Sequence, residues 1–136
     1  DSLIIYRNGF DDCADMIPGN ETYDGYFGNY SILCEIQKEK LQAGKQYTAA
    51  VKFKWKYSSD IHAVLIAEWN SEQPLNWLVT ESITQTHQIY AYYYIKQISF
   101  SIPDTEGGLL KIFVKGADDS KSVFSVDEVV VFEMPE

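Results

Sequence analysis

The residues best suited to chemistry in this sequence are aromatic rings that lie close to side-chain amides. Two tryptophans flank a short polar segment, and a tyrosine-rich run follows later in the chain beside several glutamines. A sugar ring has one apolar face of C–H bonds and a rim of hydroxyl groups, so flat aromatic rings and planar amides suit it. The sequence therefore predicts a carbohydrate-type site made of Trp69, Trp77, Tyr90, Tyr92, Tyr93 and Gln97.

Residues for catalysis are sparse by comparison. The chain has two histidines, His62 and His87, which lie in no nucleophile motif, and it has no glycine-rich phosphate-binding loop. A carboxylate pair for glycoside hydrolysis depends on separation in space, so the twenty acidic residues leave that alternative open. We expect a protein that is not an enzyme.

The elements that must position these side chains follow from period-two alternation. It is clearest from Lys45 to Tyr57, which predicts a long strand with one buried face. Turn residues at Gly44 and at Ser58–Asp60 bound this strand, and the next strand is expected to run antiparallel to it. Further strands are predicted at Leu3–Tyr6, Tyr30–Ile36, Ile61–Trp69, Trp77–Ile83, Gln88–Ile102, Leu109–Lys115 and Val123–Glu133, with a long loop over Asn8–Asn29.

The strand predicted at Ile61–Trp69 has two apolar faces. The face with Ala63, Leu65, Ala67 and Trp69 combines small residues with a terminal aromatic, which would suit the floor of a shallow groove and would leave Val64 and Ile66 in the core. The alternative is that the two alanines pack under large neighbouring side chains. Alternation alone leaves both arrangements open.

The tyrosine run has a similar ambiguity. If Ile98, Phe100 and Ile102 point inward, unbroken alternation sends Tyr90, Tyr92 and Tyr94 inward and places Tyr93 with Gln97 outward. One bulge would reverse the tyrosines. Because successive strand residues face opposite ways, at least one of three consecutive tyrosines faces outward unless a bulge intervenes.

Short strands with little helix, separated by turn residues, are typical of an all-β, antiparallel two-sheet β-sandwich of the jelly-roll kind. Only Glu35–Leu41 offers a plausible helical turn, and it could equally extend a strand or form a loop. A length of 136 residues, a 46% hydrophobic composition and the lack of a repeat or linker predict one domain over residues 1–136.

Charge narrows the range of partners. Eleven basic against twenty acidic residues give a formal net charge of -9, which disfavours nucleic acid and anionic membrane surfaces. We expect a secreted or extracellular domain, part of a larger multidomain polypeptide, whose signal peptide has been removed or lies outside this sequence. Cys13 and Cys34 could form one disulfide or remain free and buried, since spacing does not decide geometry.

Four segments, in this order, resemble the carbohydrate-binding modules of families 4, 9 and 22, which have a galactose-binding-like jelly roll. They are Asn8–Asp12, Leu41–Thr48, Ile98–Pro103 and Phe124–Val129. The resemblance implies a non-catalytic module that targets an appended enzyme to a plant-type polysaccharide such as a β-glucan, xylan or xyloglucan. Two departures bear on the ligand: Asp11 stands where the family usually has Glu, and Tyr92–Tyr94 stand where a Trp is frequent.

The resemblance also implies a possible structural calcium ion between the N-terminal turn and the last strand, at the positions of Asp11 and Asp127. Calcium takes six to eight oxygen ligands, so backbone carbonyls or water would have to complete the shell. From the residue types alone, the alternative is that Asp11 caps a turn while Asp127 lies at a β-bulge.

Two other functions remain compatible with the sequence. One is an adhesion or assembly domain of a bacterial surface or phage tail protein, in which exposed aromatic residues meet protein or a host polymer. The other is a spacer domain without a ligand.

Overall fold

The computed structural model describes residues 3–16, 22–23, 26–27, 30–55, 61–69, 76–85, 93–103, 108–116 and 124–135. Within these ranges the chain forms strands and one short 3-10 turn. The elements are β1 (Leu3–Met16), β2 (Thr22–Tyr23), β3 (Tyr26–Phe27), β4 (Tyr30–Gln37), η1 (Lys38–Lys40), β5 (Gln46–Trp55), β6 (Ile61–Trp69), β7 (Asn76–Gln85), β8 (Tyr94–Ser101), β9 (Leu109–Gly116) and β10 (Phe124–Glu133).

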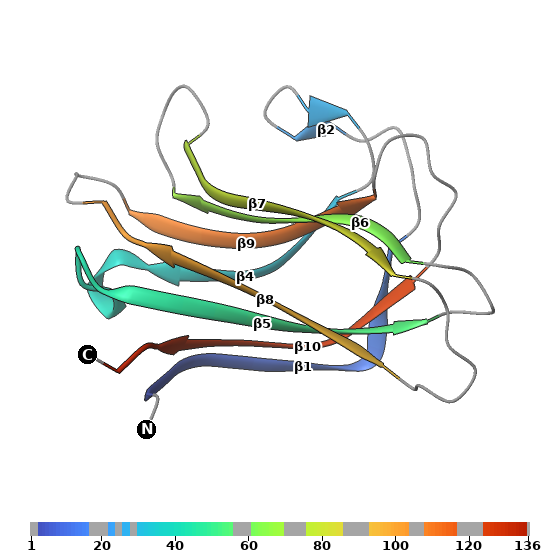
Figure 1. The fold of residues 1–136 in the computed structure, drawn as a ribbon, viewed down its shortest axis with the longest axis horizontal. Helices are drawn as coiled ribbons and strands as arrows, with labels where there is room; N and C mark the ends of the chain where they lie inside the picture. Colours follow the sequence, from blue (N-terminus) through green and yellow to red (C-terminus); the bar gives the residue numbers. More distant parts are fainter. Residues whose placement is uncertain are drawn as a thin grey trace.

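Among the described residues, the strands form two four-stranded antiparallel sheets and one two-stranded hairpin. The first sheet has the order β1-β10-β5-β8, and the second has the order β4-β9-β6-β7. The two sheets lie face to face as a sandwich (Figure 1), and the chain crosses repeatedly from one to the other. This architecture confirms the predicted all-β jelly-roll sandwich.

The space between the sheets holds one hydrophobic core. Val51 and Phe53 come from the first sheet, and Leu65, Leu110 and Ile112 come from the second; all five are fully buried. The edge strands β7 and β8 lie side by side and close one side of the sandwich, where Lys96 Nζ lies 3.9 Å from Glu81 Oε2. The strands of the two four-stranded sheets therefore present one face to this core and the other to the outside.

The turn before β5 explains the Leu-x-x-Gly-Lys-x-Tyr pattern of the sequence. Gly44 has a φ of 84°, a left-handed conformation that favours glycine, and the Lys45 N–H donates to the Gln42 carbonyl at 3.3 Å. The Gln42 N–H donates to the Tyr47 hydroxyl at 2.7 Å, and Leu41 and Tyr47 are both buried. The motif thus folds one turn onto the core at the start of β5.

Three expectations for the elements are corrected. β1 continues to Met16, and β2 and β3 also lie in the segment expected to be loop. The glycine and aspartate residues of this segment indicated a loop. A register shift between Gly9 and Ala14 accommodates them and lets β1 continue. β5 and β6 are not neighbours in a sheet, because they enter opposite layers of the sandwich.

The segment with a possible helical turn divides between two elements. Its first residues extend β4, and the next three form η1. Among the described residues there is no helix whose length and apolarity would let it cross a membrane.

Cys34 lies in the core beside Ile112, its cross-strand partner in β9. It is a free thiol, so it does not form the disulfide alternative with Cys13, whose side chain lies outside the described residues. Desolvation in the core raises the pKa of Cys34 to about 12.

The buried thiol predicts slow chemical modification of the native protein. In a Cys13→Ser variant at pH 8, we expect Cys34 to react with iodoacetamide at least about a hundredfold more slowly than an unhindered cysteine, because only the thiolate reacts and the raised pKa depletes it. Labelling should accelerate as the pH rises towards 12 and should reach the ordinary rate in denaturant. Fast labelling of the native protein at pH 8, followed by mass spectrometry, would contradict this placement.

Candidate functional site

The candidate site is the face of the β4-β9-β6-β7 sheet that points away from the core. Strand alternation places Leu65, Ala67 and Trp69 in the core, so Val64, Ile66 and Glu68 face the other way. The ladder between β6 and β9 sets Ile66 opposite Phe113 and Glu68 opposite Lys111. We call this surface the outer face of the second sheet: Ile32, Val64, Ile66, Glu68, Thr80, Ser82, Lys111 and Phe113.

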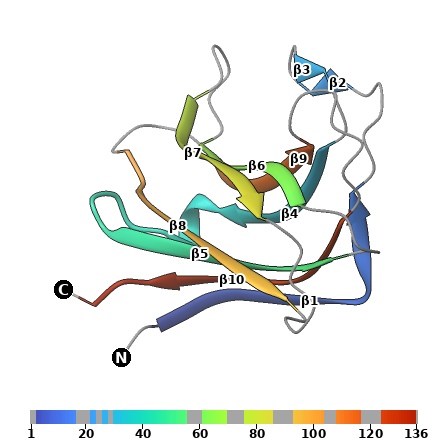
Figure 2. The ribbon, with the colours of Figure 1, turned by 45° about the vertical axis from the view of Figure 1, so that its right-hand side comes forward.

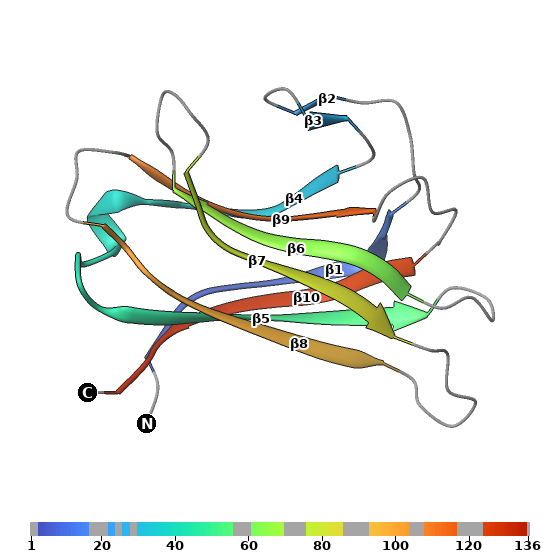
Figure 3. The same cartoon turned by 45° about the horizontal axis from the view of Figure 1, so that its top comes forward.

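The centre of this outer face is buried although it lies outside the core. Ile66 is 0% and Phe113 is 1% exposed, yet neither belongs to the core cluster between the sheets. The β2–β3 hairpin lies on this side of the sheet, away from the first sheet (Figures 2 and 3). The outward face of an antiparallel sheet is commonly polar and solvated, so this second buried apolar layer shows that the protein itself covers the centre of this face.

Glu68 makes this buried layer chemically distinctive. It is a charged residue of which only 3% is exposed, at the end of an apolar strand. Its cross-strand partner is Lys111, and opposite charges at directly opposed positions stabilise a sheet. Burying a carboxylate is costly unless it is paired, so its position next to a lysine fits the rule that buried charges have partners.

Exposed hydroxyl groups border the buried centre. Thr80 and Ser82 of β7 are cross-strand partners of Ile66 and Val64, and both are exposed. Val64 and Lys111 are half-buried. The accessible part of the outer face therefore combines hydroxyl groups and an ammonium group over an apolar support.

The prediction that Trp69 is a ligand platform is wrong. Its side chain is 1% exposed and belongs to the core, together with Ala63, Leu65 and Ala67. The opposite face of β6, with Val64 and Ile66, is the one that points outward. The indole Nε1 of Trp69 is buried and has no hydrogen-bond partner among the described residues.

Trp77 lies on β7 of the same sheet, where its backbone is the cross-strand partner of Glu68. The structure thus brings this predicted residue to the position next to the buried carboxylate. Its side chain lies outside the described residues, and so do Tyr90 and Tyr92 in full.

Tyr93 and Gln97 lie on a different surface. Ile98, Phe100 and Ile102 are buried and the β5–β8 ladder has no register shift, so Tyr94 packs against the core. Tyr93, which is 48% exposed, and Gln97 therefore face outward from the first sheet, as unbroken alternation predicted.

Lys52 Nζ lies 4.3 Å from the centre of the Tyr93 ring. One face of that ring is thus already in contact with a cation. The described residues of the predicted cluster therefore do not share one surface: Trp69 lies in the core, whereas Tyr93 and Gln97 face outward from the first sheet.

The two residues of the predicted calcium pair lie on opposing strands at the same register shift of the first sheet. Asp127 has no Cα partner in either ladder of β10, and the part of β1 that contains Asp11 lies opposite, between Gly9 and Ala14. Both carboxylate oxygens of Asp127 face lysine ammonium groups, an environment that does not suit a divalent cation. The Asp11 side chain lies outside the described residues, so the calcium ion stays a prediction.

Sequence reasoning missed Glu68 and Phe113. The sign of Glu68 was present: a single acidic residue inside the apolar run Ile61–Trp69 marks the face that avoids the core. For Phe113 there was no comparable sign, because β9 is apolar on both faces through Ile112, Phe113 and Val114.

No family model matches the sequence, and no curated protein matches it either. Solved structures do match the fold. A family 4 carbohydrate-binding module is 16% identical with a TM-score of 0.64, over 98% of this chain and 78% of that one. The CBM22-1 xylan-binding domain of Paenibacillus barcinonensis Xyn10C is 12% identical with a TM-score of 0.61, over 99% and 97%.

A third structure contains more than the similar domain. It is the N-terminal CBM22-1–GH10 part of Clostridium thermocellum xylanase Xyn10B in complex with xylohexaose, 14% identical with a TM-score of 0.57. The match covers 100% of this chain and 29% of that one. The domain thus shares the jelly roll of carbohydrate-binding modules of families 4 and 22.

Trp69→Ala should act on stability. Because the indole is in the core, we expect the variant to lose about 3–5 kcal/mol of unfolding free energy in urea titrations. Tyr93→Ala, which removes a half-exposed ring, should lose less than about 1 kcal/mol. A Trp69→Ala variant as stable as the wild type would contradict the core position of this residue.

Proposed function

We propose that this domain is a non-catalytic carbohydrate-binding module whose ligand contacts the outer face of the second sheet. The observation that carries the proposal is a sheet face outside the core on which the accessible Thr80, Ser82 and Lys111 border a buried apolar centre. Hydroxyl groups and an ammonium group pair with the hydroxyl rim of a sugar ring, and an aromatic ring supports its C–H face. The fold shared with modules of families 4 and 22 supports the same proposal.

Within this proposal, Trp77 is the aromatic platform. Its backbone lies on β7, the strand that also contains the exposed Thr80 and Ser82, so it would supply an aromatic platform next to their hydroxyl groups. A surface across neighbouring strands suits an internal segment of a chain. The proposed ligands are neutral plant-type polysaccharides: β-glucan, xylan or xyloglucan.

The proposed biological role is to hold an appended enzyme on its polysaccharide outside the cell. The net charge of -9 is compatible with a neutral glycan and disfavours a polyanion. The xylanase structure that combines a CBM22-1 module with GH10 supports this arrangement by analogy of fold.

Adhesion or assembly remains the second candidate, and one observation favours it. Tyr93 and Ile95, each 48% exposed, stand two residues apart on the outer side of the first sheet, where they could meet a protein or a surface polymer. A ligand there would leave the outer face of the second sheet without a role in binding.

Affinity electrophoresis in gels that contain xylan, β-glucan or xyloglucan separates these candidates. We expect retardation of the wild type by at least one polysaccharide and a loss of affinity of at least about tenfold in Trp77→Ala, since a central aromatic anchor typically contributes more than 1.4 kcal/mol.

Gln97→Ala, on the opposite side of the molecule, is the matched control and should bind like the wild type. Urea titrations establish that each variant is folded. Retardation by none of the polysaccharides would contradict carbohydrate binding. Loss of binding in Tyr93→Ala with full binding in Trp77→Ala would instead move the site to the first sheet.

A further inference from the structure

The first half of β10 contains a bulge that places two carboxylates on one surface. In the β10–β5 ladder, Val126 pairs with Phe53 and Glu128 pairs with Lys52, so Asp127 is an extra residue. Val126 and Val129 both point into the core. Asp127 and Glu128 therefore share the interval between two inward residues, and both reach the outer surface of the first sheet.

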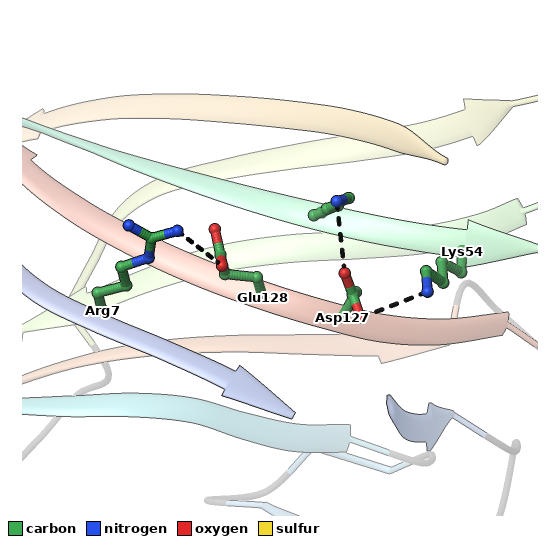
Figure 4. Close-up of polar contacts among 5 residues, drawn as sticks. Arg7, Lys54, Asp127 and Glu128 are labelled. Atoms are coloured by element: carbon green, nitrogen blue, oxygen red, sulfur yellow. Dashed lines mark hydrogen bonds and ion pairs between the residues drawn. The ribbon is translucent and has the colours of Figure 1, made fainter. Parts of the chain in front are cut away.

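Each carboxylate at this bulge has a basic partner on a neighbouring strand. Lys52 Nζ lies 3.5 Å from Asp127 Oδ2, and Lys54 Nζ lies 3.6 Å from Asp127 Oδ1. On the other side, Arg7 Nη2 lies 3.3 Å from Glu128 Oε2. In Figure 4, Asp127 of β10 lies next to Lys54 of β5, and Arg7 extends from β1 to Glu128. The pairs join β1, β10 and β5 across the bulge.

The lysines are held in place from more than one direction. Lys52 contacts Asp127 and also lies over the ring of Tyr93, so its ammonium group bridges β10 and the start of β8. Lys52 and Lys54 are two residues apart on β5 and therefore share its outer side. The side chains of Asp127 and Lys52 are 25% and 33% exposed, which reduces solvent screening of their attraction.

A calcium ion would compete with these contacts. It needs oxygen ligands on most sides, and its first ligand would be the Asp127 carboxylate, whose two oxygens already face two positive charges. The ion would have to displace both ammonium groups or remain beside them against repulsion. Among the described residues, no three or more His, Cys, Asp or Glu side chains gather where they could hold a metal.

We propose that Lys52 and Lys54 take the place of a metal ion at this bulge, so that the junction of β1, β10 and β5 is stabilised by ion pairs and is independent of calcium. The two lysines balance the charge of Asp127 and link β10 to β5 by ion pairs. A divalent cation would balance the same charge but would link β10 to β1. The stability of the domain should then respond to ionic strength and be indifferent to chelators.

Thermal unfolding tests the proposal on the wild type, Asp127→Asn and the double variant Lys52→Met/Lys54→Met. For the wild type we expect a Tm that differs by less than about 1 °C between chelator and about 5 mM calcium, a concentration that fills even weak protein sites. In chelator, the double variant should melt several degrees lower, because Asp127 loses both of its lysine contacts. This gap should narrow in about 1 M NaCl.

Lys40→Met, at an exposed position of η1, is the control for loss of a lysine and should keep the Tm of the wild type. The single variant Lys54→Met provides a milder change if the double variant does not fold. A rise of several degrees with calcium in the wild type, abolished in Asp127→Asn, would overturn the proposal. So would a double variant that melts like the wild type in chelator. Stabilisation by calcium in the double variant alone would support it, because removing the lysines would have exposed the carboxylate to the ion.

Discussion

The apolar layer between the two four-stranded sheets is the constraint on which the other features depend. Its members come from strands that are distant in the sequence, such as Phe53 of β5, Ile112 of β9 and Val129 of β10. No strand can bury its apolar side alone, and most consecutive strands enter opposite sheets. The side of each strand that faces the core then determines which residues lie on the two outer surfaces.

The two outer surfaces differ in physical character for this reason. On the second sheet, Ile66, Phe113 and Glu68 form a buried layer outside the core. On the first sheet, the outward positions hold ion pairs and exposed residues such as Tyr93 and Gln97. The exposed hydroxyl groups of Thr80 and Ser82 border this layer and can pair with ligand hydroxyl groups. Exposed ion pairs contribute less individually and tolerate solvent. The asymmetry favours a ligand on the second sheet and a structural role for the charges on the first.

The bulge at Asp127 illustrates how one irregularity can change the chemistry of a surface. Regular alternation would have sent Asp127 and Glu128 to opposite faces, one of them into the core. The extra residue sends both outward, where Lys52, Lys54 and Arg7 pair with them. Resemblance to a family identified Asp127 as a notable position, but the residues that contact it came only from the pairing of β10 with β5.

The sequence by itself determined the all-β class and the positions of most later strands, because alternation and turn residues such as Gly44 act over a few neighbouring positions. It predicted that Tyr93 and Gln97 face outward if alternation is unbroken, and the regular pairing of β5 with β8 decided that condition. Only the tertiary structure decided which side of β6 enters the core, because Ala63 and Leu65 on one side and Val64 and Ile66 on the other are all apolar. That choice depends on the opposing sheet, which buried Trp69 and left Glu68 outside the core. It also separated Trp77 from Tyr93, since neighbouring segments of a jelly roll enter different layers.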